Sequence, residues 1–328
     1  MTISGTPTKT YCNCLAQDRG LDPVGHGGYF DDCLVLEAPL PWKNDMYQTA
    51  GTLPQALIDL LALWLQDYHA GKGYPHLPLL IAPDKSYSRE GYRRVMLFTR
   101  PSGAFARFDK VEYLVPVDEV NALVWALYQD RDALPRFEAF RMPNGDQIRD
   151  LLVCMHGTVD AACSKFGYPL YKHLRAHHAD ETLRVWRVSH FGGHVFAPTL
   201  MDMPTGHYWA YVGQAQAAQI VRREDEVAAL RGHYRGWAGV SAGFQQAADC
   251  ELWQRHGWRW FDFPRTAATI EQSEQAALVR LSYTDDRALS AEVRVELTGS
   301  VDTPHSTSDA ATYPYPQYRV VSPDELLP

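Results

Sequence analysis

The hydrophobic and polar positions of residues 1–128 follow two different periods. The apolar run at residues 33–36 is typical of a buried strand, whereas residues 53–68 carry apolar side chains at helical spacing. Three short β-rich runs and a second helical segment follow at residues 77–82, 93–100, 105–115 and 118–128. The predicted order of strand, helix, strand, strand, strand, helix indicates a small sheet covered by helices.

A similar order returns in the second third of the chain. The pattern there predicts strands at residues 150–155, 183–188 and 207–213 and helices at residues 160–177 and 214–223. The repeated plan predicts an α/β protein of two related units and raises the hypothesis of an internal duplication. Two prolines and a glycine in residues 135–145 place the expected boundary between a domain at residues 1–142 and a second at 143–328.

From about residue 230 the chain is expected to extend the second unit and to pack on it. The pattern predicts a helix at residues 240–256, strands at 276–283, 289–297 and 318–321, and a loop at 300–316. The tryptophans next to this helix are expected in the core rather than on a docking face; they are Trp237, Trp253, Trp258 and Trp260.

Composition and charge exclude several classes of partner. Of the 328 residues, 46% are hydrophobic and 21% charged, which is typical of a folded globular protein. The net charge of -8 provides no basic surface for nucleic acid or anionic membranes. Residues 1–9 lack the apolar core of a signal peptide, and no run approaches the roughly 18 apolar residues of a membrane span. We therefore expect a cytoplasmic protein; a homodimer stays open.

The cysteines are sparse, and in a reducing compartment sparse cysteines are more often free, catalytic or metal-bound than paired. Cys12 and Cys14 fall in a polar N-terminal arm, where we expect no role and no fixed structure. Cys154 and Cys163, in contrast, enclose a loop of eight residues (155–162) behind a predicted strand. The Cys154 and Cys163 thiols are therefore candidate metal ligands.

Two histidines complete the candidate site. His190 and His194 flank Gly192 and Gly193 directly after the next predicted strand, with three residues between them. The glycines allow the backbone to come close to a bulky group. Structural Cys₂His₂ zinc sites space their cysteines two to four residues apart, which this cysteine pair does not match. A wider loop suits a larger iron-sulfur cluster, for which thiolate pairs are the usual anchors.

The segments CMHGTVDAACSKFG (154–167) and RVSHFGGHVFAPT (187–199) resemble the signature of the sucrase/ferredoxin-like family. Similar stretches at residues 35–42, 93–101 and 234–260 extend the resemblance over most of the chain. It implies a thioredoxin-like [2Fe-2S] ferredoxin fold, here in two thioredoxin-like units, with Cys154 and Cys163 as thiolate ligands and His190 and His194 as imidazole ligands.

The implied function is one-electron transfer by a carrier rather than catalysis, between redox donor and acceptor proteins that the sequence does not identify. Imidazoles in place of two thiolates raise the potential of such a cluster and can couple a proton to the electron. The simplest assignment puts the cysteines on one iron and the histidines on the other. Nothing indicates sugar chemistry, because no carboxylate pair stands out among the 39 acids.

Two alternatives of other classes remain at this stage. One is a zinc-stabilised structural or interaction protein, and the other is a thiol oxidoreductase with Cys154 or Cys163 as nucleophile. Near the site, His156 is expected to donate to a cluster sulfur or to lie on the surface. Arg187 is expected to tune the potential, meet a partner or form a salt bridge.

Overall fold

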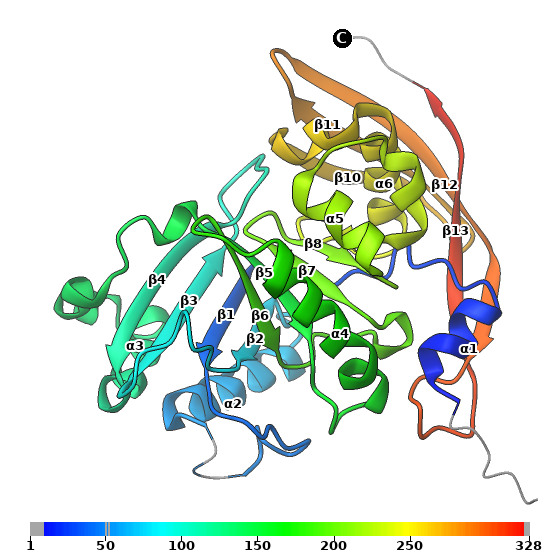
Figure 1. The fold of residues 1–328 in the computed structure, drawn as a ribbon. Coiled ribbons are helices and arrows are strands. Elements are labelled where there is room, and N and C mark those ends of the chain that lie inside the picture. Colours follow the sequence, from blue (N-terminus) through cyan, green and yellow to red (C-terminus); the bar gives the residue numbers. More distant parts are fainter. Residues whose placement is uncertain (1–9, 50, 52, 325–328) are drawn as a thin grey trace, which may run out of the picture.

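The structure is a computed structural model that describes residues 10–49, 51 and 53–324. Residues 1–9, on which the expected lack of a signal peptide rests, lie outside the described residues. Within the described part, no helix has both the length and the apolar character that a membrane crossing requires. The protein is a mixed α/β structure with one sheet of nine strands and one of four strands (Figure 1).

The first unit confirms the predicted order of elements. These are β1 (Asp32–Glu37), α2 (Gln55–His69), β2 (His76–Ile81), β3 (Tyr92–Thr99), β4 (Asp109–Pro116) and α3 (Val120–Tyr128). β1 pairs with β2 in parallel and with β3 antiparallel, and β4 pairs antiparallel with β3. The strand order is therefore β4-β3-β1-β2. The helices cover the sheet through Leu57, Leu60 and Leu123, which are all 1% exposed or less.

The second unit repeats the same plan. Its elements are β5 (Arg149–Cys154), α4 (Ala161–His177), β6 (Leu183–Val188), β7 (Leu200–Met203), β8 (His207–Trp209) and α5 (Gln214–Arg222). Here β5 and β6 are parallel, β7 is antiparallel to β5, and β8 is antiparallel to β7. The order β6-β5-β7-β8 mirrors that of the first unit, and β9 (Tyr234–Trp237) follows at the edge.

The two units share one continuous sheet. β2 and β6, each at the edge of its own unit, pair antiparallel at Ile81 and Val188. The strands of the second unit therefore follow in the reverse of the first unit's order, with β9 added at the end. The expected linker is occupied by short 3₁₀-helices, and the domain boundary at residue 142 stays a prediction. The described 3₁₀-helices are η1 (Val117–Glu119), η2 (Arg131–Phe140), η3 (Gly145–Gln147), η4 (His194–Phe196), η5 (Val227–His233) and η6 (Gly257–Asp262).

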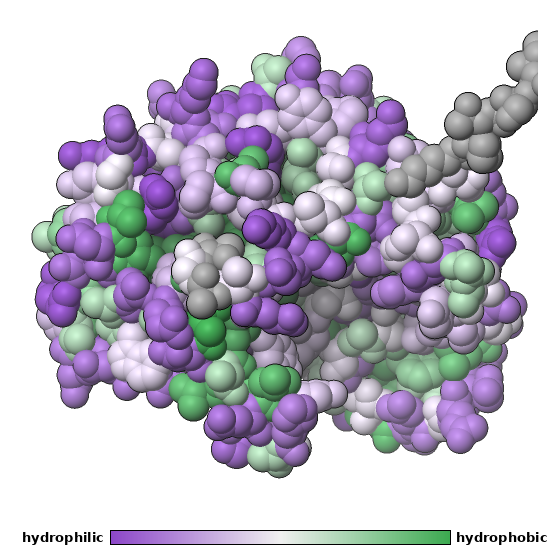
Figure 2. All heavy atoms as spheres, turned by 90° about the horizontal axis from the view of Figure 1, so that it is seen from below, coloured by the Kyte–Doolittle hydropathy of each residue, from purple (hydrophilic) through white to green (hydrophobic). Residues whose placement is uncertain are grey.

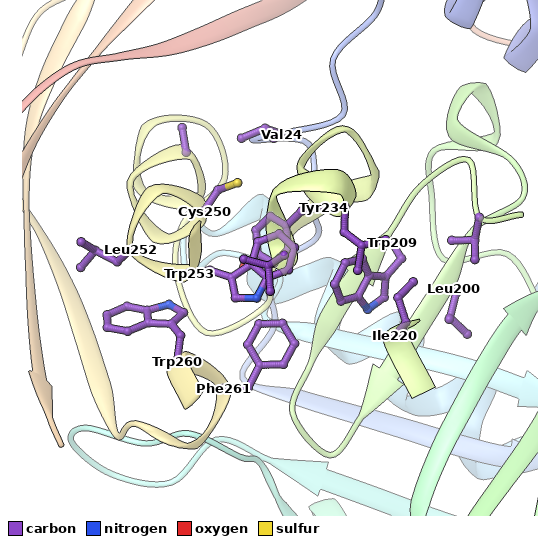
Figure 3. Packing of buried hydrophobic residues seen from close by; sticks show 14 of the residues in the cluster. Val24, Leu200, Trp209, Ile220, Tyr234, Cys250, Leu252, Trp253, Trp260 and Phe261 are labelled. Atoms are coloured by element: carbon purple, nitrogen blue, oxygen red, sulfur yellow. The ribbon is translucent and has the colours of Figure 1, made fainter. Parts of the chain in front are cut away.

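The C-terminal extension packs on the second unit, as predicted. It consists of α6 (Phe244–His256) and an antiparallel sheet of β10 (Arg265–Gln272), β11 (Ala276–Thr284), β12 (Ala288–Thr303) and β13 (Tyr313–Asp324). In Figure 3, Trp253 lies next to Tyr234, between Trp209 of the second unit and Trp260. Trp237, Trp253 and Trp260 are fully buried, which confirms that the tryptophans next to α6 belong to the core; Trp258 is half-buried against it.

Some local predictions were wrong at the ends of the chain. The predicted loop at 300–316 is too long: residues 300–303 and 313–316 are strand, because the ladder between β12 and β13 continues to Thr303 and Tyr313, and only residues 304–312 form the loop. The arm with Cys12 and Cys14 forms α1 (Cys12–Asp18), and Cys12 is fully buried. Both errors have one physical reason. α1 and the hairpin lie side by side although they are far apart in the sequence, so no local pattern indicates the contacts that order them (Figure 1).

Seen from below, from the side where α2 and α4 lie in Figure 1, the surface is mainly hydrophilic with small scattered hydrophobic groups. A hollow opens near the middle of this face (Figure 2).

Candidate metal centre

Two parallel strands bring the predicted ligands to one edge of the sheet. Cys154 is the last residue of β5 and pairs with Val188, the last residue of β6. His190 follows β6 by two residues, and Cys163 lies in the first turn of α4. Because neighbouring parallel strands end at the same edge, the loops that follow them meet there.

Three of the four predicted ligands form a compact group. The Nδ1 atom of His190 lies 3.8 Å from the Sγ atom of Cys154 and 3.8 Å from that of Cys163. One ligand atom from each of the three residues lies within 4.8 Å of the others. Both cysteines are 1% exposed, whereas His190 is half-buried. The thiols are therefore withdrawn from solvent behind an imidazole that reaches the surface.

The fourth predicted ligand, His194, lies behind His190 rather than within the compact group. The two rings stack with centroids 5.1 Å apart and planes at 25°. His194 is buried, and among the described residues neither ring nitrogen has a partner at normal hydrogen-bond geometry, although the His305 backbone lies close enough to raise its pKa. Burial lowers its pKa, and the neighbouring His190 adds to this effect. Unpartnered buried nitrogens are costly, so the His194 ring is suited to a ligand that the protein itself does not provide.

A tight turn connects the two histidines. Gly192 and Gly193 have φ angles of 88° and 78°, in the left-handed region that favours glycine. The turn leads directly into η4, whose first residue is His194. The backbone therefore reverses between the rings, and both face the same side of the loop.

The contact between the two thiols shifts their pKa values in opposite directions. The hydrogen bond from Cys163 lowers the pKa of Cys154 well below its ordinary value, although burial opposes this, and His190 contributes in the same direction. The contact with Cys154, together with burial, raises the pKa of Cys163. Cys154 is therefore the residue that holds a thiolate most readily, and a thiolate is the form that binds a metal.

The hairpin between β12 and β13 holds the helix that carries Cys163. Asp160 caps α4 by accepting from the backbone N–H of Ala162 at 2.7 Å. Its carboxylate also accepts from the backbone N–H and the hydroxyl of Thr307, both at 2.7 Å, and from the Ser306 hydroxyl at 2.8 Å. Burial raises the pKa of Asp160, but the hydrogen bonds from Thr307 outweigh it, so the pKa is lowered. Cys12 lies beside this carboxylate.

His305, at the tip of the same hairpin, extends the row of imidazoles to the surface. Its ring centroid is 4.9 Å from that of His194, and its Nδ1 atom is 2.6 Å from the Tyr315 hydroxyl. The sequence analysis missed His305 because residues 300–316 carry no pattern that ties them to the site. Asp160, in contrast, had a readable signal, since Asp is a preferred residue directly before a helix.

The structure tests part of what was predicted for the residues around the ligands. His156 is buried and its Nδ1 accepts from the backbone N–H of His190 at 3.3 Å, so it holds the ligand loop rather than a sulfur. Arg187 donates to the Pro83 carbonyl at 3.1 Å and lies over the Tyr171 ring. Within the described residues it forms no salt bridge, so that alternative was wrong.

The other cysteines lie apart from the compact group. All six cysteines are free, and burial raises the pKa of Cys12 to about 11 and that of Cys33 well above the ordinary value. Burial likewise raises the pKa of Cys250 and of the half-buried Cys14. Among the described residues, none of these four cysteines belongs to the group that brings three ligand atoms within 4.8 Å of one another.

The fold and these side chains define a mixed α/β protein with a buried Cys/His group at one edge of its main sheet. Residues 23–236 match the model of the sucrase/ferredoxin-like family, and the chain belongs to this family. The match covers more than half of the chain and includes all four predicted ligands, but it ends before α6 and the four-stranded sheet. Neither the curated proteins nor the solved structures compared with the chain include a significant match.

Proposed function

We propose that the chain is an electron-transfer protein that holds a [2Fe-2S] cluster with Cys154, Cys163, His190 and His194. One observation carries the proposal: ligand atoms from β5, α4 and the loop after β6 converge within 4.8 Å in a protein of the sucrase/ferredoxin-like family. When bound, such a cluster takes up and releases a single electron.

The donor set fits a cluster of this kind. Two thiol sulfurs are the usual anchors of iron-sulfur clusters, and imidazoles replace the second pair in one known class of [2Fe-2S] centre. His194 supports the proposal because both of its ring nitrogens are buried without a partner. The positive φ angles of Gly192 and Gly193 support it too, since they keep side chains out of the turn between the imidazoles.

The protein's own residues hold and shield the site. The capped first turn of α4 fixes Cys163, and the hydrogen bond from the His190 backbone to His156 fixes the histidine loop. The cysteines are almost completely shielded from water, whereas half-buried His190 provides the path to the surface. This arrangement suits exchange of electrons with a docked redox protein better than turnover of a substrate at the sulfurs.

The proposal includes three further expectations from the sequence. The first is a thioredoxin-like fold for each unit, supported by the repeated strand order and by the parallel pairs β1 with β2 and β5 with β6. The second is a cytoplasmic location with redox partner proteins, supported by six free cysteines. The third is a proton on the imidazoles coupled to the electron, which stays a prediction.

A zinc-stabilised protein is the second candidate, and one measurement favours it. Around a single tetrahedral zinc ion with bonds of about 2.3 Å to sulfur and about 2.0 Å to nitrogen, ligand atoms lie roughly 3.5 Å apart. The two distances of 3.8 Å from His190 to the thiols are close to this value. The unpartnered ring of His194, which could serve as the fourth ligand in either case, does not separate the two candidates.

Elemental analysis tests the proposal directly. We expect protein purified under argon to contain roughly two iron and two sulfide ions per chain and to absorb in the visible range. Stoichiometric zinc without iron or sulfide would overturn the proposal in favour of the zinc site. Metal-free protein that reduces disulfides through Cys154 would overturn it in favour of the thiol oxidoreductase.

A further inference from the structure

Arg235 differs from the other buried arginines of the described chain. Four arginines are buried: Arg94, Arg184, Arg235 and Arg265. Arg94 and Arg184 each pair with Glu112, and Arg265 pairs with Asp249. Arg235 lies on β9, is 6% exposed and has no carboxylate partner among the described residues. Burying an unpaired guanidinium is costly, so this position calls for a compensating negative charge.

The guanidinium of Arg235 lies against the turn that connects the two histidines. Its Nη1 atom donates to the carbonyl oxygen of Gly192 at 2.9 Å. A Cβ atom at Gly193 would overlap the guanidinium, so glycine is required there for space as well as for its positive φ angle. Arg235 therefore packs directly on the backbone between His190 and His194.

The remaining surroundings of Arg235 are aromatic. Its Cζ atom lies 5.0 Å from the centroid of the Phe196 ring and 5.6 Å from that of Tyr208, and its Nε atom has no hydrogen-bond partner in the part of the chain that the structure describes. Burial lowers the pKa of Arg235 to about 10, so it stays charged at neutral pH. The electrostatic interactions that oppose this lowering come, largest first, from Tyr208, Cys154, Tyr211 and Tyr315. The other three are tyrosines, so Cys154 is the proposed cluster ligand among them.

We propose that Arg235 is the counter-charge of the metal centre and the anchor of its histidine loop. The inference rests on the proposed function and deepens it. The guanidinium anchors the loop through the Gly192 carbonyl, and its charge stabilises the negative charge of the thiolates. Reduction adds one electron, and thus one negative charge, next to thiols that are almost completely shielded from water. An unpaired cation nearby favours this reduced state and raises the potential.

Arg235 acts here as a positioning residue, because its guanidinium contacts the loop and not the ligand atoms. Its effect on potential and its effect on the loop can be separated by substitution. Arg235→Gln removes the charge and keeps a side chain that can donate to Gly192. Arg235→Lys keeps the charge and loses the planar fork that spans the turn. Arg259→Gln removes one exposed arginine on η6 and controls for net charge.

The test measures iron, sulfide and midpoint potential in the full-length protein and these three variants. We expect full cluster content in Arg235→Gln, with the ratio of reduced to oxidised protein at the wild-type midpoint about tenfold lower, equivalent to about 59 mV for one electron. The Lys variant should keep a potential close to wild type and lose iron faster, and the Arg259→Gln variant should match wild type in both.

Each outcome separates the inference from the proposed function. Wild-type protein without iron and sulfide overturns the proposed function and removes the basis of the inference. A loaded Arg235→Gln protein with the wild-type potential overturns the counter-charge while leaving the cluster intact. If the Gln variant does not fold, the Lys variant decides: a potential close to wild type supports the counter-charge, and a fall of tenfold or more in the same ratio overturns it.

Discussion

The two units of the main sheet have the same strand order, but the compact Cys/His group lies in the second unit. Where Cys154 ends β5, Glu37 ends β1, and where His190 follows β6 by two residues, Pro83 follows β2. The third residue of α4 is Cys163, and that of α2 is Leu57. Equivalent backbone positions thus carry the proposed ligands in one unit and ordinary side chains in the other.

The connection between the first strand and helix differs in the same way. Residues 155–160 join β5 to α4 directly, whereas residues 38–54 form a much longer connection from β1 to α2. The short connection keeps Cys163 next to Cys154, and Asp160 at its end caps the helix. Both units therefore have a sheet edge of the same kind, and the candidate site in the second unit depends on its shorter loop and on a few side chains.

The largest expected effect is on cluster retention, and it should differ between the cysteines of the two units. Cys154→Ala or Cys163→Ala should abolish cluster retention, because each removes a thiolate at the centre of the group. Cys33→Ala on β1 is the matched control and should retain all of its iron. Iron and sulfide analysis of the three variants is the measurement. Full iron content in Cys154→Ala would show that the second unit does not hold the cluster as proposed.

The next prediction concerns a buried histidine of the second unit. His207 on β8 is fully buried, and burial together with Arg265 lowers its pKa well below its ordinary value. The unfolded chain then binds a proton that the folded chain does not, so stability is lost as pH falls below about 6.5, by up to about 1.4 kcal/mol per pH unit.

We expect His207→Gln to flatten this part of the stability curve between about pH 6.5 and pH 4.5. Urea unfolding at several pH values measures the slope. His69→Gln, at the exposed end of α2 in the first unit, is the control and should keep the wild-type slope. An unchanged slope in His207→Gln would mean that other groups cause the acid sensitivity.

A smaller effect on cluster retention is expected from the β12–β13 hairpin, which contacts the N-terminal cap of α4. Thr307→Val removes the hydroxyl that donates to Asp160, which weakens the cap of α4 by about 1 kcal/mol. The cluster should form but lose iron faster when challenged with a chelator. Ser308→Ala on the same loop leaves the Asp160 contacts in place and is the control. Equal rates of iron loss in both variants would contradict a role of the hairpin at the site.

The smallest effect is expected at Glu37, the counterpart of Cys154 in the first unit. Burial raises the pKa of Glu37, and one of its oxygens has no partner. A raised carboxyl pKa stabilises the folded chain below the ordinary pKa of about 4.5, and this contribution is lost as pH rises through the raised value.

Glu37→Gln should therefore leave the iron content unchanged and alter stability at pH 7 by less than about 1 kcal/mol. Unfolding by urea at pH 5 and pH 7, combined with iron analysis, measures both quantities. A loss of iron would mean that the first unit contributes to the centre.

Much of the fold could be predicted because its central elements have strong local patterns. The strand predicted at residues 183–188 is β6 (Leu183–Val188), and the helix predicted at residues 160–177 is α4 (Ala161–His177). β7 was missed because it is only four residues long and contains Asp202, a buried acid whose burial depends on Arg149 and Arg223 from other elements.

The site was predictable to the extent that its residues cluster in sequence. Cys154 lies at the end of one predicted strand, Cys163 at the start of the helix that follows it, and His190 directly after the next predicted strand, which is why their convergence could be expected. Arg235 and His305 could not be found in this way, because an arginine on an edge strand and a histidine in a hairpin loop have no local signal. Their roles follow from contacts with Gly192 and His194, which only the folded chain brings close.

The central claim is that two cysteines and two histidines together hold a [2Fe-2S] cluster. Pulsed electron paramagnetic resonance of the reduced protein, with histidine labelled by ¹⁵N, tests it most directly, because iron-bound nitrogens couple strongly to the unpaired electron. We expect two coupled histidine nitrogens in wild type and one in each of His190→Cys and His194→Cys. A reduced cluster without coupled nitrogens would contradict histidine ligation, and the absence of any reducible iron signal would contradict the cluster itself.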